Sequence, residues 1–382
     1  MPDGGNRMPD TGRTISSDIR QPASDLLSVE HLTTLFDLPA GPAPAVIDVS
    51  FEVNAGETLC LVGESGSGKS VTAFSILNLV QPPGRIAAGR IMFKGRDLRA
   101  LPEREMQKVR GAEIALVFQE PMTALNPVFT VGNQIEETLK VHGVARGAAA
   151  RTRAIELLEA VSMPDPGRRV RDYPHQLSGG LRQRALIALA LACEPEILIA
   201  DEPTTALDVT IQAQILDLLR DLKRRFGLAL LLITHDLGVV AEMADRVAVM
   251  YAGRIVEEAP VRDLFGDPRH PYTRGLLASI PGGAPGSKLQ AIQGTVPPVG
   301  RLPPGCSFAP RCPRQFDPCL IAPPGVTVIA AVGDGRHPMG DMTAQQRIGH
   351  RASDIGDESA HTARCYLYSP AIDPETLPEA KC

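Results

Sequence analysis

The 382-residue sequence has no tryptophan, and aromatic residues make up only 4% of it. Proteins that bind single-stranded nucleic acid usually stack the bases on aromatic side chains, so this composition argues against such a surface. The formal net charge of −5 gives the chain no overall positive charge that would attract nucleic acid or an anionic membrane. We therefore expect no nucleic-acid partner.

Long apolar runs are also absent. No segment approaches the length needed to cross a bilayer, and residues 1–25 lack the apolar core of a signal peptide. We expect residues 1–25 to form a disordered tail and the chain to lie in the cytoplasm. Because thiols stay reduced there, the seven cysteines are expected to be buried side chains or metal ligands and not disulfides.

Three segments alternate polar residues with β-branched or aromatic ones, which predicts antiparallel strands at 26–36, 46–53 and 89–98. The intervening segment DLPAGPAPA, residues 37–45, is rich in proline and glycine. We expect it to be a loop.

Three other runs are almost continuously apolar, which is typical of strands buried on both faces: 57–63, 195–201 and 228–236. Helical patterns lie between them, such as the apolar stripe of residues 211–226. Strands that alternate with helices predict a parallel α/β sheet. Residues 122–177 have a mainly helical pattern that interrupts this alternation, so we expect a helical subdomain there.

The segment GESGSGKS matches G-x-x-x-x-G-K-[ST] and directly follows a predicted buried strand. Glycines in this pattern let backbone N–H groups surround phosphates, and the following helix directs its positive end at them. Lys69 is expected to reach the β- and γ-phosphates, and the Ser70 hydroxyl to bind Mg²⁺. The predicted nucleotide-binding residues are Gly63, Glu64, Ser65, Gly66, Ser67, Gly68, Lys69 and Ser70. The alternative is an ordinary glycine-rich strand–helix turn.

Polar residues also follow other buried strands. Asp201 ends one strand, where open α/β sheets place ligand-contacting groups, and it is expected to hold Mg²⁺ through water. Its neighbour Glu202 is the candidate for orienting or deprotonating the attacking water. His235 is a candidate hydrogen-bond donor to a γ-phosphate, and Gln119 could reach Mg²⁺ or the water. Each assignment has an alternative. Asp201 and Glu202 could form a helix N-cap, His235 could have a purely structural role, and Gln119 could be a surface residue at a turn.

Ser178, Gly179 and Gly180 stand directly before a strongly helical segment. A Ser-Gly-Gly turn at a helix N-terminus is either a plain N-cap or a second anion site. One nucleotide does not need two phosphate-binding turns. We therefore expect one of the two to serve a nucleotide that another subunit holds.

Together these residues resemble the ATP-binding subunits of ABC transporters over about residues 26–265. The matching elements, in order, are the phosphate loop, the Q-loop residue Gln119, the signature LSGGLRQR, the Walker B pair, TALD ending at Asp208, and the switch His235. The resemblance implies a P-loop ABC ATPase core of α/β class, with a mixed sheet, an antiparallel β arm and a helical subdomain. It also implies ATP as the nucleotide, a nucleotide-site role for Asp208, and an aromatic residue stacked on adenine, for which Phe36 is the candidate.

The segment HPYTRGLLASIP narrows the resemblance to importers of dipeptides, oligopeptides and nickel. This implies a peripheral ATPase on the cytoplasmic face of the bacterial inner membrane. The implied partners are a second ATPase subunit (a related chain or another copy), two transmembrane permease subunits and a solute-binding protein. Residues 120–127 are implied to dock on a membrane subunit, with Met122, Ala124 and Leu125 lining the groove. A soluble ABC ATPase acting on DNA or ribosomes is the alternative.

Three cysteines in GCSFAPRCPRQFDPC have the spacing C-x5-C-x6-C: Cys306, Cys312 and Cys319. Cys365 is the first candidate for a fourth thiolate, and Cys382 is the reserve. Four thiolates suit structural zinc or an iron–sulfur cluster, and the spacing alone does not decide between them. The resemblance favours a 4Fe–4S cluster and a peptide importer, because peptide-importer subunits carry a similar tail that nickel-importer relatives generally lack. We expect a small, irregular accessory domain at 266–382.

Overall fold

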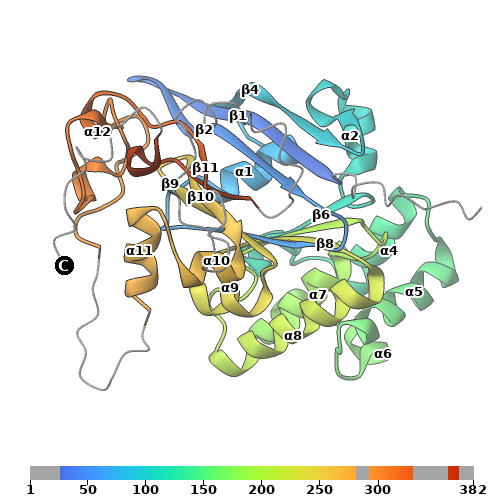
Figure 1. The fold of residues 1–382 in the computed structure, drawn as a ribbon. Helices are drawn as coiled ribbons and strands as arrows, with labels where there is room; N and C mark the ends of the chain where they lie inside the picture. Colours follow the sequence, from blue (N-terminus) through green and yellow to red (C-terminus); the bar gives the residue numbers. More distant parts are fainter. Residues whose placement is uncertain (1–25, 281–291, 330–359, 370–382) are drawn as a thin grey trace, which may run out of the picture.

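The computed structural model describes residues 26–280, 292–329 and 360–369. Their strands form two sheets, one antiparallel and one mixed (Figure 1). The expected tail at residues 1–25 and the reserve ligand Cys382 lie outside the described residues. No helix in the described ranges combines the length and the apolar character needed to cross a bilayer.

The antiparallel sheet contains the three alternating segments of the sequence. Its order is β2-β1-β4-β5, with β1 (Leu27–Leu38), β2 (Gly41–Val53), β4 (Gly84–Phe93) and β5 (Arg96–Asp97). The loop expected at residues 37–45 is wrong, because Asp37 pairs with Pro42 and the turn is confined to Pro39 and Ala40. Prolines are tolerated in β2 because this strand lies at an edge of the sheet, where a missing N–H leaves the inner pairing intact.

The mixed sheet has the order β11-β12-β10-β9-β3-β8-β7-β6. Its parallel part contains β3 (Thr58–Val62), β6 (Ile114–Val117), β7 (Ile197–Asp201), β8 (Ala229–Thr234) and β9 (Arg246–Tyr251). Every residue of β3, β7 and β8 is buried, so the prediction of strands covered on both faces is confirmed. The antiparallel strand β10 (Arg254–Pro260) pairs with β9.

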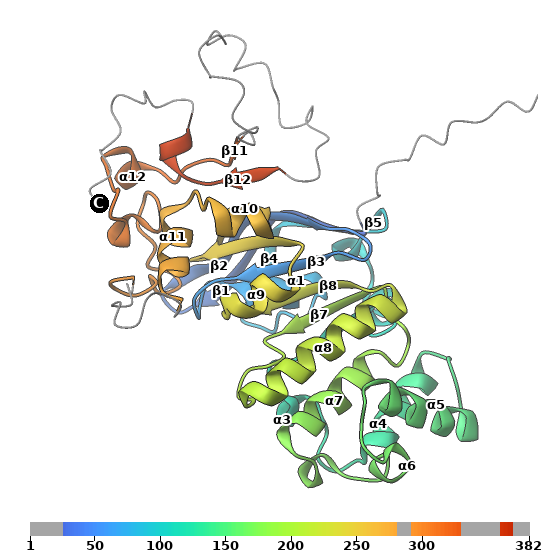
Figure 2. The same ribbon diagram turned by 60° about the horizontal axis from the view of Figure 1, so that its bottom comes forward.

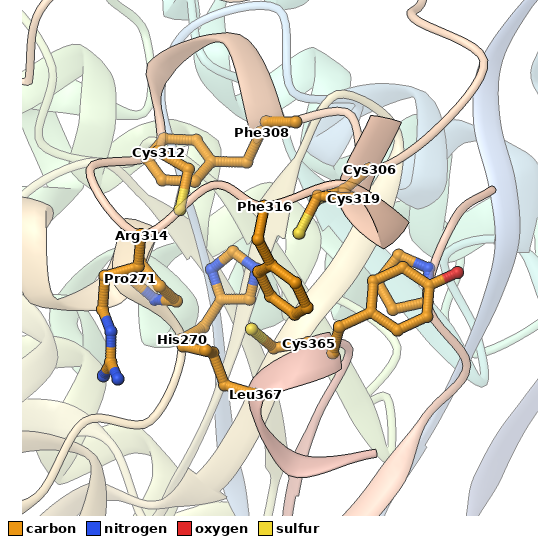
Figure 3. A pocket seen from close by; sticks show the side chains of 13 residues that line it. His270, Pro271, Cys306, Phe308, Cys312, Arg314, Phe316, Cys319, Cys365 and Leu367 are labelled. Carbon is orange, nitrogen blue, oxygen red and sulfur yellow. The ribbon is translucent and has the colours of Figure 1, made fainter. Parts of the chain in front are cut away.

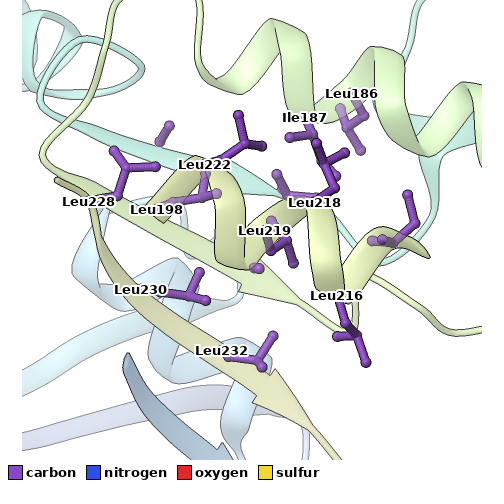
Figure 4. Packing of buried hydrophobic residues seen from close by; sticks show 14 of the residues in the cluster. Leu186, Ile187, Leu198, Leu216, Leu218, Leu219, Leu222, Leu228, Leu230 and Leu232 are labelled. Atoms are coloured by element: carbon purple, nitrogen blue, oxygen red, sulfur yellow. The ribbon is translucent and has the colours of Figure 1, made fainter. Parts of the chain in front are cut away.

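Helices cover the parallel strands. They are α1 (Lys69–Ile76), α2 (Glu103–Val109), α7 (Gly179–Ala190), α8 (Val209–Phe226), α9 (Leu237–Met243) and α10 (Val261–Gly266), with the short turn η1 (Leu98–Ala100) before α2. The predicted stripe of α8 is buried, and the helix ends at Gly227, which is left-handed with φ 65°. Figure 4 shows leucines of α8 packed between α7 and the leucines of β7 and β8. These contacts hold the carboxyl ends of the parallel strands in place.

The expected helical subdomain is present. It contains α3 (Pro121–Ala124), α4 (Val131–Val141), α5 (Gly147–Ala160), α6 (Pro166–Arg169) and η2 (Pro174–Gln176). Its helices α4, α5 and α6 lie beside α7, away from the antiparallel sheet (Figure 2). Met122 is 47% exposed, whereas Leu125 is 1% exposed within the main core. The expected groove lining is therefore wrong for Leu125, because its side chain is already buried inside the subunit.

The residues after α10 pack on the ATPase sheet. They form α11 (Pro271–Ala278), η3 (Ala309–Arg311), α12 (Pro318–Ile321), β11 (Thr327–Ile329), β12 (His361–Ala363) and η4 (Tyr366–Tyr368). Strand β12 pairs with β10, and β11 pairs with β12, so this part extends the mixed sheet. The Phe308 ring lies 5.2 Å from the Tyr251 ring and 5.4 Å from the Tyr272 ring, measured between centroids. The domain boundary placed at residue 265 stays a prediction.

Candidate nucleotide-binding site

The phosphate loop connects β3 to α1 and depends on glycine at two positions. A Cβ at Gly63 would lie 2.2 Å from the Met250 carbonyl oxygen, and one at Gly68 would lie 2.6 Å from that of Ala45. Both glycines also have positive φ, 154° and 103°, which other residues rarely adopt. The loop is thus fixed closely against β2 and β9.

Lys69 is almost fully buried at the start of α1. Its Nζ donates to the carbonyl oxygens of Gly63 at 2.8 Å and Glu64 at 3.1 Å. Burial lowers the Lys69 pKa, and the nearby carboxylates of Glu202 and Asp201 act in the opposite direction. The ammonium group is therefore held inside the loop, close to the place where phosphates enter.

Asp201 ends β7 and is 2% exposed. Burial raises its pKa, and a hydrogen bond from the Ser70 hydroxyl acts against that effect. Its Oδ1 is buried without a hydrogen-bond partner among the residues that the structure describes. An unsatisfied carboxylate oxygen beside a hydroxyl is the kind of donor pair that Mg²⁺ prefers, so these two residues fit the expected Mg²⁺ site.

Glu202 receives hydrogen bonds from three sides. Gln119 Nε2 lies 2.9 Å and Thr205 Oγ1 lies 2.8 Å from its Oε2, and His235 Nδ1 lies 3.1 Å from its Oε1. Burial raises the Glu202 pKa, but the hydrogen bonds from Thr205 and His235 outweigh it and leave the pKa below its ordinary value. The structure thus brings together Glu202, Gln119 and His235, which the sequence analysis proposed for contacts with the attacking water, Mg²⁺ and the γ-phosphate.

A cavity of about 390 Å³ opens over the loop and is large enough for most of a nucleotide. Phe36, the candidate for adenine stacking, lines it together with Gln119 and Glu202. Leu38 and Val299 also line it, although no pattern in the sequence had singled them out. A second cavity of about 450 Å³ lies between the loop, Gln119, Glu202 and His235.

The Ser-Gly-Gly turn lies apart from both cavities. Ser178 is the exposed N-cap residue of α7, and its side chain makes no capping hydrogen bond. This leaves the hydroxyl and the first amides of α7 available to another molecule. Asp208 instead caps α8 of its own chain, because its Oδ1 accepts from the Ile211 backbone amide at 2.9 Å.

Four cysteines surround one small space, as Figure 3 shows: Cys306, Cys312, Cys319 and Cys365. The cavity between them is about 10 Å³, roughly the space of one water. Burial raises the pKa of Cys312 to about 11 and that of Cys365 to about 12. The backbone amides of Arg314 and Leu367 donate to these two sulfurs and favour their thiolate forms.

The four cysteine sulfurs match a four-thiolate metal site in the number and the chemistry of the ligand atoms. As they stand, however, no three His, Cys, Asp or Glu side chains in the described ranges are arranged to hold a metal ion. Neither the expected 4Fe–4S cluster nor the alternative zinc ion is therefore supported by the arrangement itself. Of the other cysteines, Cys60 is fully buried in β3, as expected, and Cys193 is only partly buried.

The phosphate loop, the buried aspartate and the Glu202 cluster lie at the carboxyl ends of parallel strands, as in P-loop ATPases. The antiparallel sheet beside the loop and the helical subdomain distinguish the ABC type among them. This chain is an ABC-type ATPase, and the two parts of its sequence match two known families. Residues 46–205 match the family described as ABC transporter, and residues 256–319 match the oligopeptide/dipeptide transporter C-terminal region.

Curated relatives are similar in sequence to this chain over most of its length. It is 54% identical over 305 residues to the oligopeptide transport ATP-binding protein AppD of Bacillus subtilis, covering 79% of this chain and 93% of that protein. It is 52% identical to the dipeptide transport ATP-binding protein DppD of the same organism, covering 79% of this chain and 91% of that protein. The chain belongs to the ABC transporter ATP-binding proteins that carry the oligopeptide/dipeptide C-terminal region.

Solved structures confirm the fold. The chain resembles the ATP-binding cassette MJ0796, described as a dimer in a post-hydrolysis state with ADP and phosphate, with a TM-score of 0.56 and 30% identity. That match covers 62% of this chain and 99% of the other. The cassette cbiO1 of Clostridium perfringens is similar at a TM-score of 0.54 and 25% identity, covering 64% and 91%.

Proposed function

We propose that this chain is the ATP-hydrolysing subunit of an importer that moves dipeptides or oligopeptides across the cytoplasmic membrane. The observation that carries the proposal is its identity of 54% to an oligopeptide transport ATP-binding protein over 93% of that protein. The C-terminal match at residues 256–319 supports the same solute class. Nickel is the other solute considered from the sequence, and the relatives reported above are named for oligopeptide and dipeptide transport.

The proposed hydrolysis uses the cluster around Glu202. Lys69 and the loop amides bind the β- and γ-phosphates, while Ser70, Asp201 and Gln119 are the residues that would hold Mg²⁺, which would neutralise phosphate charge. The Glu202 carboxylate accepts a proton from water, whose oxygen attacks the γ-phosphorus. The bond from that phosphorus to the bridging oxygen of ADP then breaks. The contact between His235 and Glu202, 3.1 Å long, supports a role for His235 in orienting this base.

Ser178, Gly179 and Gly180 are proposed to contact the γ-phosphate held by a second ATPase subunit. Ser178 and Gly179 are exposed, Gly180 is half-buried, and none of the three lines the two cavities described above, which supports this division of roles. Asp208, beside the same surface at the start of α8, is proposed to lie at the subunit boundary. The partner is a related chain or another copy.

The remaining proposed partners are two transmembrane permease subunits and a solute-binding protein, with the ATPase on the cytoplasmic face of the inner membrane. Exposed apolar side chains beside α3 support the docking surface: Met122 at 47%, Val128 at 70% and Phe129 at 47% exposed. Isolated apolar residues are common on surfaces, but several near one loop indicate a contact site.

We also propose that the four cysteines around the small cavity hold a 4Fe–4S cluster, with zinc as the alternative. The proposal is motivated by the convergence of four cysteines on one small space, two of them buried and two half-buried, and by the amide donors to the sulfurs of Cys312 and Cys365. Protein purified without oxygen should contain about four irons per chain, and Cys312→Ser should lose them while ATP binding persists. Stoichiometric zinc in colourless protein would identify the alternative.

The decisive experiment for the function is reconstitution. The chain is placed in vesicles with its permease subunits and partner ATPase, and uptake is measured with a solute-binding protein that carries either a labelled peptide or Ni²⁺. We expect ATP-dependent uptake of peptide alone. Uptake of Ni²⁺ alone would refute the peptide assignment. Failure to assemble with permeases, with turnover stimulated by DNA or ribosomes, would favour the soluble ATPase.

A further inference from the structure

An arginine of the C-terminal part reaches the phosphate loop from 247 residues away in sequence. Arg311 ends η3, directly before Cys312, and its Nη1 lies 3.0 Å and 3.2 Å from the two carboxylate oxygens of Glu64. The Arg311 side chain is only 5% exposed, and that of Glu64 is 31% exposed. Such a pair is shielded from water on the arginine side, so it is far less screened than a surface ion pair.

The arginine is held in this position by other contacts. Its Nε donates to the Gln293 carbonyl oxygen at 2.9 Å, and its guanidinium lies over the Tyr251 ring, 5.7 Å from the centroid. Glu64 is also held at its backbone, since its amide donates to the Tyr272 hydroxyl at 2.9 Å. Arg311 of η3 and Tyr272 of α11 both lie outside the ATPase motifs, and together they fix Glu64 in the phosphate loop.

The charge of Glu64 matters because of where it stands. It is the second residue of the loop that receives the phosphates, and its backbone carbonyl is 3.1 Å from Lys69 Nζ. Its carboxylate is close enough to act on Lys69, whose pKa it raises. An unpaired carboxylate there would repel the triphosphate, whereas a paired one adds little net charge.

We propose that Arg311 is a positioning residue of the nucleotide site, which neutralises and orients Glu64 so that the phosphate loop accepts ATP. The nucleotide affinity of this chain thus depends on the segment that carries the cysteines. The inference rests on ATP binding by the chain and holds whichever solute the importer moves. Failure of the peptide assignment would leave it untouched.

The test compares the affinities of the full chain and its variants for a non-hydrolysable ATP analogue, measured by calorimetry. Arg311→Gln should raise the Kd about five- to tenfold, the usual scale of coupling between neighbouring sites. Glu64→Gln should stay near the parent value. The double variant should match Glu64→Gln, because no carboxylate remains to be neutralised. Arg301→Gln, an exposed change in the same part of the chain, is the matched control.

This rescue separates a positioning role from a structural one. If Arg311 merely fastened the C-terminal part, the double variant would bind as weakly as Arg311→Gln, and that result would overturn the proposal. An unchanged Kd in a folded Arg311→Gln variant would do the same. If Arg311→Gln does not fold, the test compares the double variant with Glu64→Gln. Equal Kd values for these two variants support the proposal, and a Kd about five times higher for the double variant refutes it. The loss of affinity caused by Arg311→Gln should also be smaller for ADP than for the ATP analogue, because ADP carries less charge.

Discussion

Glu202→Gln should stop turnover while leaving nucleotide binding intact. A glutamine side chain has the same shape, and its single oxygen can still accept from Gln119 and Thr205, which both contact Oε2 in the parent. Its amide would face His235 Nδ1, which in one tautomer can accept a hydrogen bond. Because the geometry is preserved, the change removes mainly the basicity of the carboxylate. Loss of a positioned general base costs about 10²- to 10⁴-fold in rate.

The assay is phosphate release by the assembled transporter at saturating Mg-ATP, together with the Kd for ATP of the isolated chain. Turnover should fall at least about 100-fold, and the Kd should change little because Lys69 and the loop amides remain. Glu105→Gln, an exposed carboxylate on α2, is the control and should behave as the parent. The reduced pKa keeps Glu202 ionised at neutral pH, so protonation cannot mimic the variant there. Retention of parental turnover would remove Glu202 from the role of base.

Three further changes test other parts of the molecule. Gly305→Ala would place a Cβ 2.1 Å from the Cys319 carbonyl oxygen and should cost ~1–3 kcal/mol, seen as a lower Tm, whereas Gly325→Ala meets nothing within 4 Å and should leave the Tm unchanged. Met122→Glu should abolish solute uptake but keep basal ATPase activity and nucleotide binding; undiminished uptake would discredit the docking surface. In a heterodimer, Ser178→Arg should slow hydrolysis at the partner's site while a photoreactive ATP analogue still labels this chain, and loss of that label alone would contradict shared sites.

The nucleotide motifs were predictable because their chemistry is local. A phosphate loop needs a strand, glycines and a helix start within a few residues, and these are adjacent in the sequence. The positions of the residues that follow β7 and β8 were equally predictable, since parallel strands bring their carboxyl ends to one sheet edge. Glu202 and His235, which follow these two strands, lie within hydrogen-bond distance of each other.

What the sequence did not reveal depends on tertiary packing. Residues 37–45 have the composition of a loop, yet they continue β1 and β2 because the edge of the sheet accepts prolines. Leu125 directly follows the four-residue helix α3, which is too short to show a periodic stripe, so no pattern assigned its side chain to the core or the surface. Val299 and Arg311 lie in proline-rich sequence that carries no nucleotide-binding motif, and only the fold brings them to the nucleotide site.

The packing of the C-terminal part also determines how it can be studied. Glu257 of β10 is fully buried and accepts hydrogen bonds from the backbone amides of Arg269 and His270 and from His361. Removing everything after α10 would take away these hydrogen-bond partners together with strand β12, which pairs with β10 at this residue. It would also uncover Tyr251, which packs against Phe308. A truncated chain would therefore lose ATPase stability for reasons unrelated to the cysteines, and only point variants can separate the two.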